Sequence, residues 1–128
     1  MLTNPSDLVA KAKATIRECS VIDAKDCLER DALLIDIREP AEYRRGHIAG
    51  ALFIPRGMLE FEIHGVVQSA RKDRGKPPEE QAIVLYCGTG GRSALAAATM
   101  AELGYRNVRS MSGGIVAWAQ AGLPVAAP

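Results

Sequence analysis

One thiol, three glycines and one guanidinium lie close together in residues 82–93, Ala-Ile-Val-Leu-Tyr-Cys-Gly-Thr-Gly-Gly-Arg-Ser. The apolar, β-branched run before Cys87 predicts a buried strand, and the alanine-rich stretch 93–103 predicts a helix. The glycines between them let the backbone curl, so that successive N–H groups point inward and form a site for an anion. The start of the helix adds partial positive charge, and Arg92 adds a full charge. We therefore expect Cys87 to be mostly thiolate at neutral pH.

These contributions are large enough to ionise a thiol. A helix terminus in good geometry contributes up to about 2 kcal/mol, and each hydrogen bond to a charged group contributes about 1.5 to 3 kcal/mol. A single cysteine is otherwise often buried and serves only to fill space. The glycine loop and the arginine favour a chemical role for Cys87 over that structural one.

The composition indicates one ordinary globular domain. The chain has 128 residues, of which 48% are hydrophobic and 24% charged, and its net charge of +1 gives no field for nucleic acid or membrane binding. Its longest apolar run, 82–87, is too short to cross a bilayer, and residues 1–7 carry no signal-peptide pattern. We therefore expect a cytoplasmic protein without nucleic-acid or membrane partners.

The cysteines do not indicate a disulfide framework or a metal site. There are three, Cys19, Cys27 and Cys87, an odd number without the spacing of metal ligands. We expect free thiols in a reducing compartment, no metal and no cofactor. Cys19 and Cys27 are expected to be buried or inert.

Patterns of strands and helices alternate along the chain. Strands are predicted at 19–22, 32–37, 51–54, 82–86 and 107–111. Helices are predicted after an N-cap at Ser6, from Asp23 to Arg30, at 41–45, within 57–74, at 93–103 and, with Trp118, after Gly113-Gly114. This order implies an α/β fold, with a mostly parallel sheet of about five strands and helices on both faces. Because ligands in such folds bind beyond the carboxyl ends of the strands, the site is expected near Asp36, Cys87 and Met111.

Three separate motifs resemble the rhodanese-like domain family. The run Asp36 to Ala51 is similar to the family's Asp-x-Arg and Glu-aromatic-x-x-Gly-His-Ile-x-Gly-Ala signature. The loop Cys87 to Arg92 resembles the active-site loop of single-domain sulfurtransferases, and Leu103-Gly104-Tyr105, Val108, Gly113-Gly114 and Trp118 form the third match. The resemblance spans residues 19–123. It implies a rhodanese-like α/β domain over 19–128, preceded by a helical extension at 1–18.

The resemblance implies a sulfurtransferase that works through a persulfide. Cys87 would take the outer sulfur of a donor such as thiosulfate or a persulfide and pass it to cyanide or a thiol, in covalent, ping-pong catalysis. The partners implied are therefore a small sulfur donor, its acceptor and a sulfur-relay protein, with the chain a monomer or a weak homodimer. The terminal sulfur is anionic and needs several hydrogen-bond donors. Those expected are the amides of Gly88, Thr89, Gly90, Gly91, Arg92 and Ser93.

Other side chains match family positions near the pocket, and physics favours supporting roles for them. Asp36 and Arg38 are expected to pair and anchor loops, and Glu42 is expected to be an anchor as well. Arg92 would either bind the anionic donor or fix the loop. A thiolate that has already formed needs no base, so His47 is expected to be a hydrogen-bonded structural histidine.

Several further residues are expected to take no part in the reaction. Trp118 is expected in the core, and His64 alone and exposed. Within 57–63, the apolar residues Met58, Leu59, Phe61 and Ile63 are expected to belong to the core of a helix. The alternative is that they form a rim for a partner protein that delivers or accepts sulfur.

The glycine at position 88, directly after the cysteine, affects which sulfur donor is expected to bind. Many members of the family have a basic or larger side chain directly after the cysteine, whereas here Arg92 is the one cation of the loop. We therefore expect weak binding of the thiosulfate dianion, with a persulfide or another protein as the donor.

Three rival functions fit parts of this pattern. A cysteine phosphatase or arsenate reductase also uses a Cys-loop-Arg cradle, but that cradle is one residue longer than Cys87 to Arg92. A dinucleotide site would need an acidic residue about 20 positions after the glycines, and no Asp or Glu follows Glu102. A non-catalytic binding or regulatory module of the same family is the third, and the presence of Cys87 weakens it.

Overall fold

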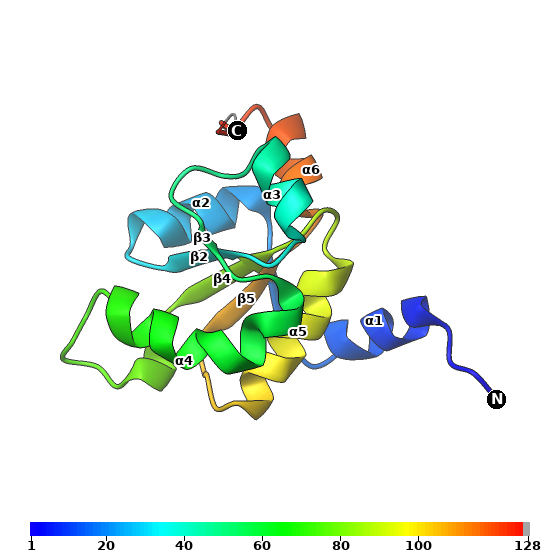
Figure 1. Ribbon diagram of the computed structural model, residues 1–128, viewed down its shortest axis with the longest axis horizontal. Coiled ribbons are helices and arrows are strands. Elements are labelled where there is room, and N and C mark those ends of the chain that lie inside the picture. Colours follow the sequence, from blue (N-terminus) through cyan, green and yellow to red (C-terminus); the bar gives the residue numbers. More distant parts are fainter. Residues whose placement is uncertain (127–128) are drawn as a thin grey trace.

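Five parallel strands form one sheet in the computed structural model, which describes residues 1–126 (Figure 1). The spatial order is β1-β5-β4-β2-β3, and each neighbouring pair is parallel. The strands are β1 (Arg17–Cys19), β2 (Leu33–Asp36), β3 (Leu52–Phe53), β4 (Ile83–Tyr86) and β5 (Val108–Met111). The sheet confirms the predicted α/β class. It also brings the carboxyl ends of β2, β4 and β5 to one edge.

Helices cover both faces of this sheet. They are α1 (Pro5–Lys13), α2 (Val21–Glu29), α3 (Pro40–Arg45), α4 (Leu59–Ala70), α5 (Gly91–Glu102) and α6 (Gly114–Gln120), with short 3-10 turns η1 (Arg56–Met58) and η2 (Pro78–Glu80). In Figure 1, α2 and α6 lie above the sheet, and α4 and α5 lie below it. The two faces build two separate apolar clusters, one around α4 and α5 and the other around α2 and α6.

The strand alternation explains these two clusters. All four residues of β2 and all four of β4 are buried, as expected for strands covered on both faces. Successive side chains point to opposite faces, so Ile35 and Leu85 join the cluster of α4 and α5, and Val84 and Tyr86 join the other. Cys87 continues this alternation on the side of α4 and α5.

Two predicted boundaries are wrong because other residues cap the helices. Asn4, not Ser6, is the N-cap of α1, with Pro5 at the first helical position, where a missing N–H costs nothing. The Ser20 hydroxyl accepts from the Asp23 N–H and starts α2 at Val21, so β1 ends at Cys19 instead of Ile22. Both differences move an element boundary by two or three residues and leave the element in place.

Helix α5 begins at Gly91, two residues before the predicted start at Ser93. Gly90 precedes it in a left-handed conformation, with φ of 106°, which ordinary side chains rarely adopt. The glycine loop therefore runs directly into the helix, and the first turn of α5 belongs to the site.

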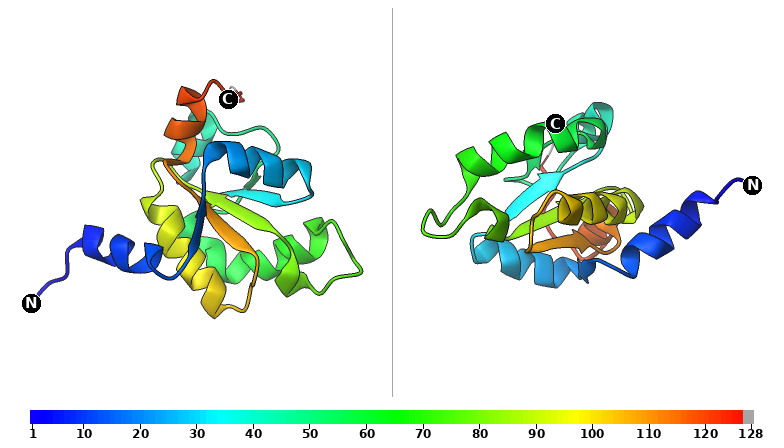
Figure 2. Two further views of the ribbon diagram at one scale, coloured as in Figure 1. Left: turned by 180° about the vertical axis from the view of Figure 1, so that it is seen from behind. Right: turned by 90° about the horizontal axis from the view of Figure 1, so that it is seen from below.

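The N-terminal helix α1 packs against α5 (Figure 2). Val9 Cγ2 would lie 3.7 Å from a Cβ placed on Gly91, so α1 reaches the residue that opens α5. Ile16, just beyond α1, packs against the cluster of α4 and α5. Helix α1 thus lies against the start of α5, beside the cysteine loop.

The segment after β3 splits the predicted apolar set in two. Leu59 and Ile63 are fully buried in the core, as predicted. Met58 and Phe61 are 42% and 82% exposed, so the prediction that they belong to the core is wrong. The buried and the exposed residues both lie on η1 and α4, and the helical period places them on opposite faces.

Among residues 1–126, every helix is too short or too polar to span a membrane.

Candidate active site

Cys87 lies directly after β4, and its thiol is enclosed by the loop that follows it. The side chain is 1% exposed. Its Sγ accepts hydrogen bonds from the N–H of Gly90 at 3.1 Å and the N–H of Ser93 at 3.4 Å. The peptide hydrogens therefore face the sulfur. Within residues 1–126, the four other amides of the predicted donor set make no bond to this sulfur, namely those of Gly88, Thr89, Gly91 and Arg92.

The first turn of α6 holds the cysteine loop in this conformation. The Ile115 N–H donates to the Cys87 carbonyl at 2.9 Å, and the Val116 N–H donates to the Gly88 carbonyl at 3.2 Å. With its carbonyls turned toward α6, the loop can turn its N–H groups toward the thiol. Gly114 allows this approach, because a Cβ there would overlap the Gly88 carbonyl.

Two buried hydroxyls extend the surroundings of the sulfur. Ser93 Oγ lies 3.5 Å from Cys87 Sγ, 3.3 Å from the Gly90 carbonyl oxygen and 2.8 Å from Ser110 Oγ. Ser93 and Ser110 are both fully buried. The sequence interpretation missed Ser110, although a serine near the carboxyl end of a predicted strand, where the site was expected, is a signal that could have found it.

Arg92 fixes the loop to α3. Its guanidinium donates two hydrogen bonds to the Glu42 carboxylate, at 2.7 and 3.0 Å. Chiefly through these bonds, Arg92 lowers the pKa of Glu42 to about 2, and Glu42 in turn raises the pKa of Arg92. The Glu42 carboxylate also accepts from the Glu39 N–H at 3.1 Å, in a capping box that starts α3.

The Arg92 side chain folds back over Gly88. Its Nη2 would lie 3.2 Å from a Cβ placed at that glycine. The absence of a side chain at position 88 therefore leaves space for the guanidinium above the loop. Arg92 and Glu42 are 42% and 30% exposed, so the pair stands at the mouth of the loop.

Asp36 and Arg38 form a buried ion pair at the end of β2, with Nη2 and Oδ2 2.8 Å apart. Arg38 also donates to the Gly46 carbonyl at 2.7 Å. The Tyr86 hydroxyl donates to Asp36 at 2.6 Å and accepts from the Ile48 N–H, and burial followed by the bond to Asp36 raises the pKa of Tyr86. This network anchors the chain after β2 to β4 and makes no hydrogen bond to Cys87.

The two histidines lie in structural contacts. The His47 ring stacks on Tyr43 with centroids 3.8 Å apart, and its Nδ1 lies 3.1 Å from the Tyr43 carbonyl oxygen. His64 is exposed, but it is not isolated as predicted, because its Nδ1 lies 2.6 Å from the Tyr105 hydroxyl. A tyrosine 41 residues away in sequence could not be assigned to it from spacing.

The remaining thiols and the tryptophan belong to the core. Cys19 is buried, and burial followed by the neighbouring Cys27 raises the pKa of its thiol to about 11. Cys27 is half-buried and packs against the same cluster. Trp118 is buried as predicted, and its indole N–H donates to the Pro124 carbonyl at 2.9 Å.

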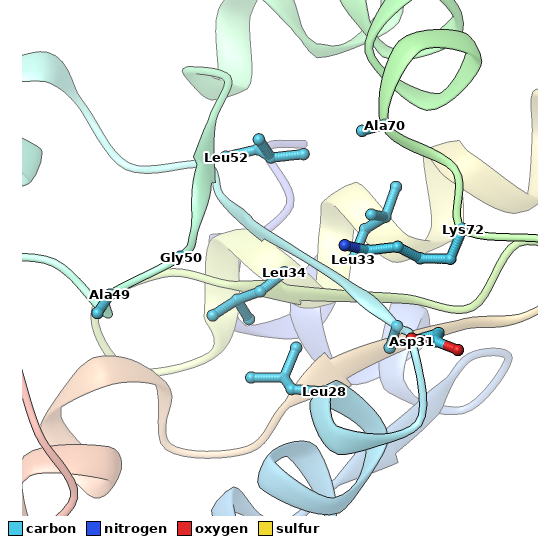
Figure 3. Close-up of a pocket in the computed structure, with 10 residues that line it drawn as sticks. Leu28, Asp31, Leu33, Leu34, Ala49, Gly50, Leu52, Ala70 and Lys72 are labelled. Atoms are coloured by element: carbon cyan, nitrogen blue, oxygen red, sulfur yellow. The ribbon is translucent and has the colours of Figure 1, made fainter.

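One surface cavity lies away from the cysteine loop, and a second one adjoins it. One of about 290 Å³ lies at the amino end of β2, away from Cys87, and is bounded on one side by Asp31 and Lys72 (Figure 3). The other, an open groove of about 330 Å³, lies between α3 and α6 and includes Glu42 and Val116. The groove adjoins the loop through both residues, so it is the one that bears on the chemistry. Among residues 1–126, no cluster of three or more metal-ligating side chains is present.

The chain is similar to known proteins over most of its length. The rhodanese-like domain family matches residues 20–121, most of the chain. The chain therefore belongs to the rhodanese-like domain family, as the motifs predicted. It is 38% identical over 98 residues to a sulfurtransferase of Allochromatium vinosum, an alignment that covers 77% of this chain and 81% of that protein.

Solved structures of similar proteins share the fold over nearly the whole chain. A polysulfide-sulfur transferase homodimer from Wolinella succinogenes has a TM-score of 0.72 and 30% identity, covering 94% of this chain and 85% of its own. A protein of unknown function from Rhodopseudomonas palustris, described as a possible tyrosine phosphatase, has a TM-score of 0.79 and 32% identity, covering 98% and 96%.

Proposed function

We propose that this protein is a sulfurtransferase that carries sulfane sulfur on Cys87 as a persulfide. The observation that carries the proposal is the pair of N–H groups, from Gly90 and Ser93, that point at the buried sulfur. Such donors stabilise negative charge on sulfur in a site from which water is largely excluded. The sulfurtransferase from Allochromatium vinosum and the polysulfide-sulfur transferase from Wolinella succinogenes support the same class of reaction.

The first half-reaction transfers one sulfur atom to the enzyme. The Cys87 thiolate attacks the outer sulfur of thiosulfate or of a persulfide, and a new S–S bond forms. The old S–S bond breaks, and its electron pair leaves with sulfite or with a thiolate. No general base is needed if the thiol is already ionised, which agrees with the structural position of His47.

The second half-reaction returns the enzyme to its starting state. Cyanide or a thiolate attacks the outer sulfur of the Cys87 persulfide, and the electron pair of the S–S bond returns to Cys87. Thiocyanate or a new persulfide leaves. In this proposal, the amides of Gly88, Thr89, Gly91 and Arg92 become donors to the outer sulfur, which stands farther from β4 than Sγ does.

Mass spectrometry tests this function directly. Incubation with thiosulfate or with a small alkyl persulfide should add one sulfur atom to the protein, and peptide mapping should place it on Cys87. Cyanide should then remove it as thiocyanate. Cys87→Ser should abolish both events, whereas Cys19→Ser and Cys27→Ser should retain them. A folded protein that takes up no sulfur from either donor would contradict the proposal and favour a non-catalytic module.

A phosphatase is the second candidate, because the similar protein from Rhodopseudomonas palustris is described as a possible tyrosine phosphatase. The loop from Cys87 to Arg92 is one residue shorter than a phosphatase cradle, and the Arg92 guanidinium donates both of its hydrogen bonds to Glu42. We therefore expect no hydrolysis of an aryl phosphate. Hydrolysis that is lost in Cys87→Ser would overturn the sulfurtransferase proposal.

The remaining parts of the proposal concern partners and location. A small sulfur donor, a thiol or cyanide acceptor and a sulfur-relay protein are the proposed partners. A cytoplasmic location and a monomeric or weakly dimeric state stay predictions. The solved polysulfide-sulfur transferase is a homodimer, so gel filtration with light scattering is the relevant measurement for this chain.

A further inference from the structure

We propose that Glu42 determines which sulfur donor this loop accepts. By neutralising Arg92, Glu42 makes the loop favour alkyl persulfides, which bring at most one negative charge, over the thiosulfate dianion. The inference rests on the proposed function and deepens it by naming the donor class. The observation that supports it is the ion pair of Arg92 and Glu42 at the mouth of the loop.

The side-chain charges nearest the sulfur cancel in pairs. Arg92 is the one charged residue from Cys87 to Ser93, and both of its hydrogen bonds in the structure go to the Glu42 carboxylate. Asp36 and Arg38 form a second neutral pair and are buried. The loop therefore presents backbone N–H groups to a ligand but little net positive charge.

Position 88 adds no charge to the loop either. Gly88 has no side chain, and the space above it is taken by the Arg92 guanidinium on its way to Glu42. Arg45 lines the neighbouring groove, but it is exposed to solvent, which screens its charge. A dianion approaching a thiolate at this loop thus meets repulsion that the solvent-screened charge of Arg45 offsets only weakly.

An alkyl persulfide avoids this repulsion. The Cys87 thiolate and R–S–S–H give Cys87–S–S–H and R–S⁻, so one S–S bond forms, one breaks and the total charge stays at −1. Thiosulfate instead brings two negative charges to the thiolate and releases sulfite with both of them. Only the second reaction gathers three negative charges at the loop, so a cation freed or added there should accelerate it selectively.

The test compares the two donors in one charge-changing variant. In the native protein, kcat/KM for cysteine persulfide should exceed that for thiosulfate. Glu42→Gln removes the carboxylate charge but keeps an oxygen for the Glu39 N–H. It should raise kcat/KM for thiosulfate about tenfold and change that for the persulfide less than about twofold. The gain should fall as salt is added.

A matched pair at position 88 tests the same idea with the Glu42 carboxylate still present. Gly88→Lys adds a cation, and Gly88→Gln adds a neutral side chain of similar length, each next to the flexible end of Arg92. Only the lysine variant should gain thiosulfate activity. Unchanged donor ratios in both Glu42→Gln and Gly88→Lys, in proteins that still form the Cys87 persulfide, would overturn this inference alone. Absence of that persulfide with both donors would overturn the proposed function instead.

Discussion

At the scale of single residues, the site depends on what surrounds one sulfur atom. Cys87 receives two amide N–H groups and lies beside the Ser93 hydroxyl, whereas Cys19 is buried without such donors among the described residues. Residue type alone does not separate these thiols. Their surroundings do, because burial raises the pKa of Cys19 whereas two amide N–H groups point at the sulfur of Cys87.

The first prediction is selective modification of Cys87. Because burial raises the pKa of Cys19 to about 11, that thiol stays protonated at pH 7 and reacts only as the pH rises toward that value. Iodoacetamide at pH 7 should therefore label Cys87 well before Cys19, as measured by peptide mapping over time. Mild denaturant should be needed to label Cys19, and faster labelling of Cys19 than of Cys87 in the native state would contradict the assignment.

The second prediction makes Ser110 a positioning residue that acts through Ser93. Ser110 Oγ lies 2.8 Å from Ser93 Oγ, so its hydroxyl can donate there while the Ser93 hydroxyl turns to a thiolate at Cys87. In Ser110→Ala, the midpoint of the pH profile for Cys87 alkylation should rise by roughly half a pH unit. Ser112→Ala, at a hydroxyl bonded to Glu18, should leave the midpoint unchanged. A purely structural Ser110 would alter stability without moving the profile.

At the scale of elements, the site is made where three of them meet. Strand β4 ends before Cys87, α5 begins within the loop, and the start of α6 holds the loop carbonyls. The packing of α6 on the loop explains a glycine of the third family motif. Gly114 lies so close to the Gly88 carbonyl that no side chain fits.

The third prediction concerns this contact between α6 and the loop. Gly114→Ala should lower the free energy of unfolding by at least about 3 kcal/mol, because a methyl group would overlap backbone atoms of the loop. Gly122→Ala is the matched control, since Gly122 also has a positive φ of 77° but nothing within 4 Å of the added methyl. It should cost only the conformational strain, about 1 to 2 kcal/mol. Equal losses in urea denaturation would contradict the packing argument.

At the scale of the whole molecule, the sequence patterns predicted most of the sheet but not the side-chain contacts between residues far apart in the chain. Short apolar runs bounded by glycine, proline and polar residues predicted β2 to β5 to within one residue at each end. The strand β1 shares only Cys19 with the predicted 19–22, because two of its three residues are exposed and give no apolar pattern. The glycines after Cys87 predicted the loop in the same local way. The pairing of Arg92 with Glu42 spans 50 residues, and the Ser93–Ser110 contact depends on the spatial neighbourhood of β4 and β5. Neither can be deduced from local spacing.

The Arg92–Glu42 pair joins distant parts of the chain and gives the fourth prediction. The pKa of Glu42 is lowered to about 2 from its ordinary 4.5, so the pair stabilises the fold above pH 4.5 and this stabilisation is lost as the pH falls toward 2. The pair is partly exposed, so its contribution is about 1 kcal/mol. Urea unfolding between pH 6 and pH 2.5 should show a smaller loss in Glu42→Gln than in the native protein. Identical losses would contradict a stabilising pair.

The central claim is that sulfur moves through this protein on Cys87. The most direct measurement is the mass of the intact protein after exposure to cysteine persulfide, followed by peptide mapping and then by addition of cyanide. The predicted result is a gain of one sulfur atom located on Cys87 and lost as thiocyanate. Sulfur found on Cys19 or Cys27 instead, or no gain in a folded protein, would contradict the account.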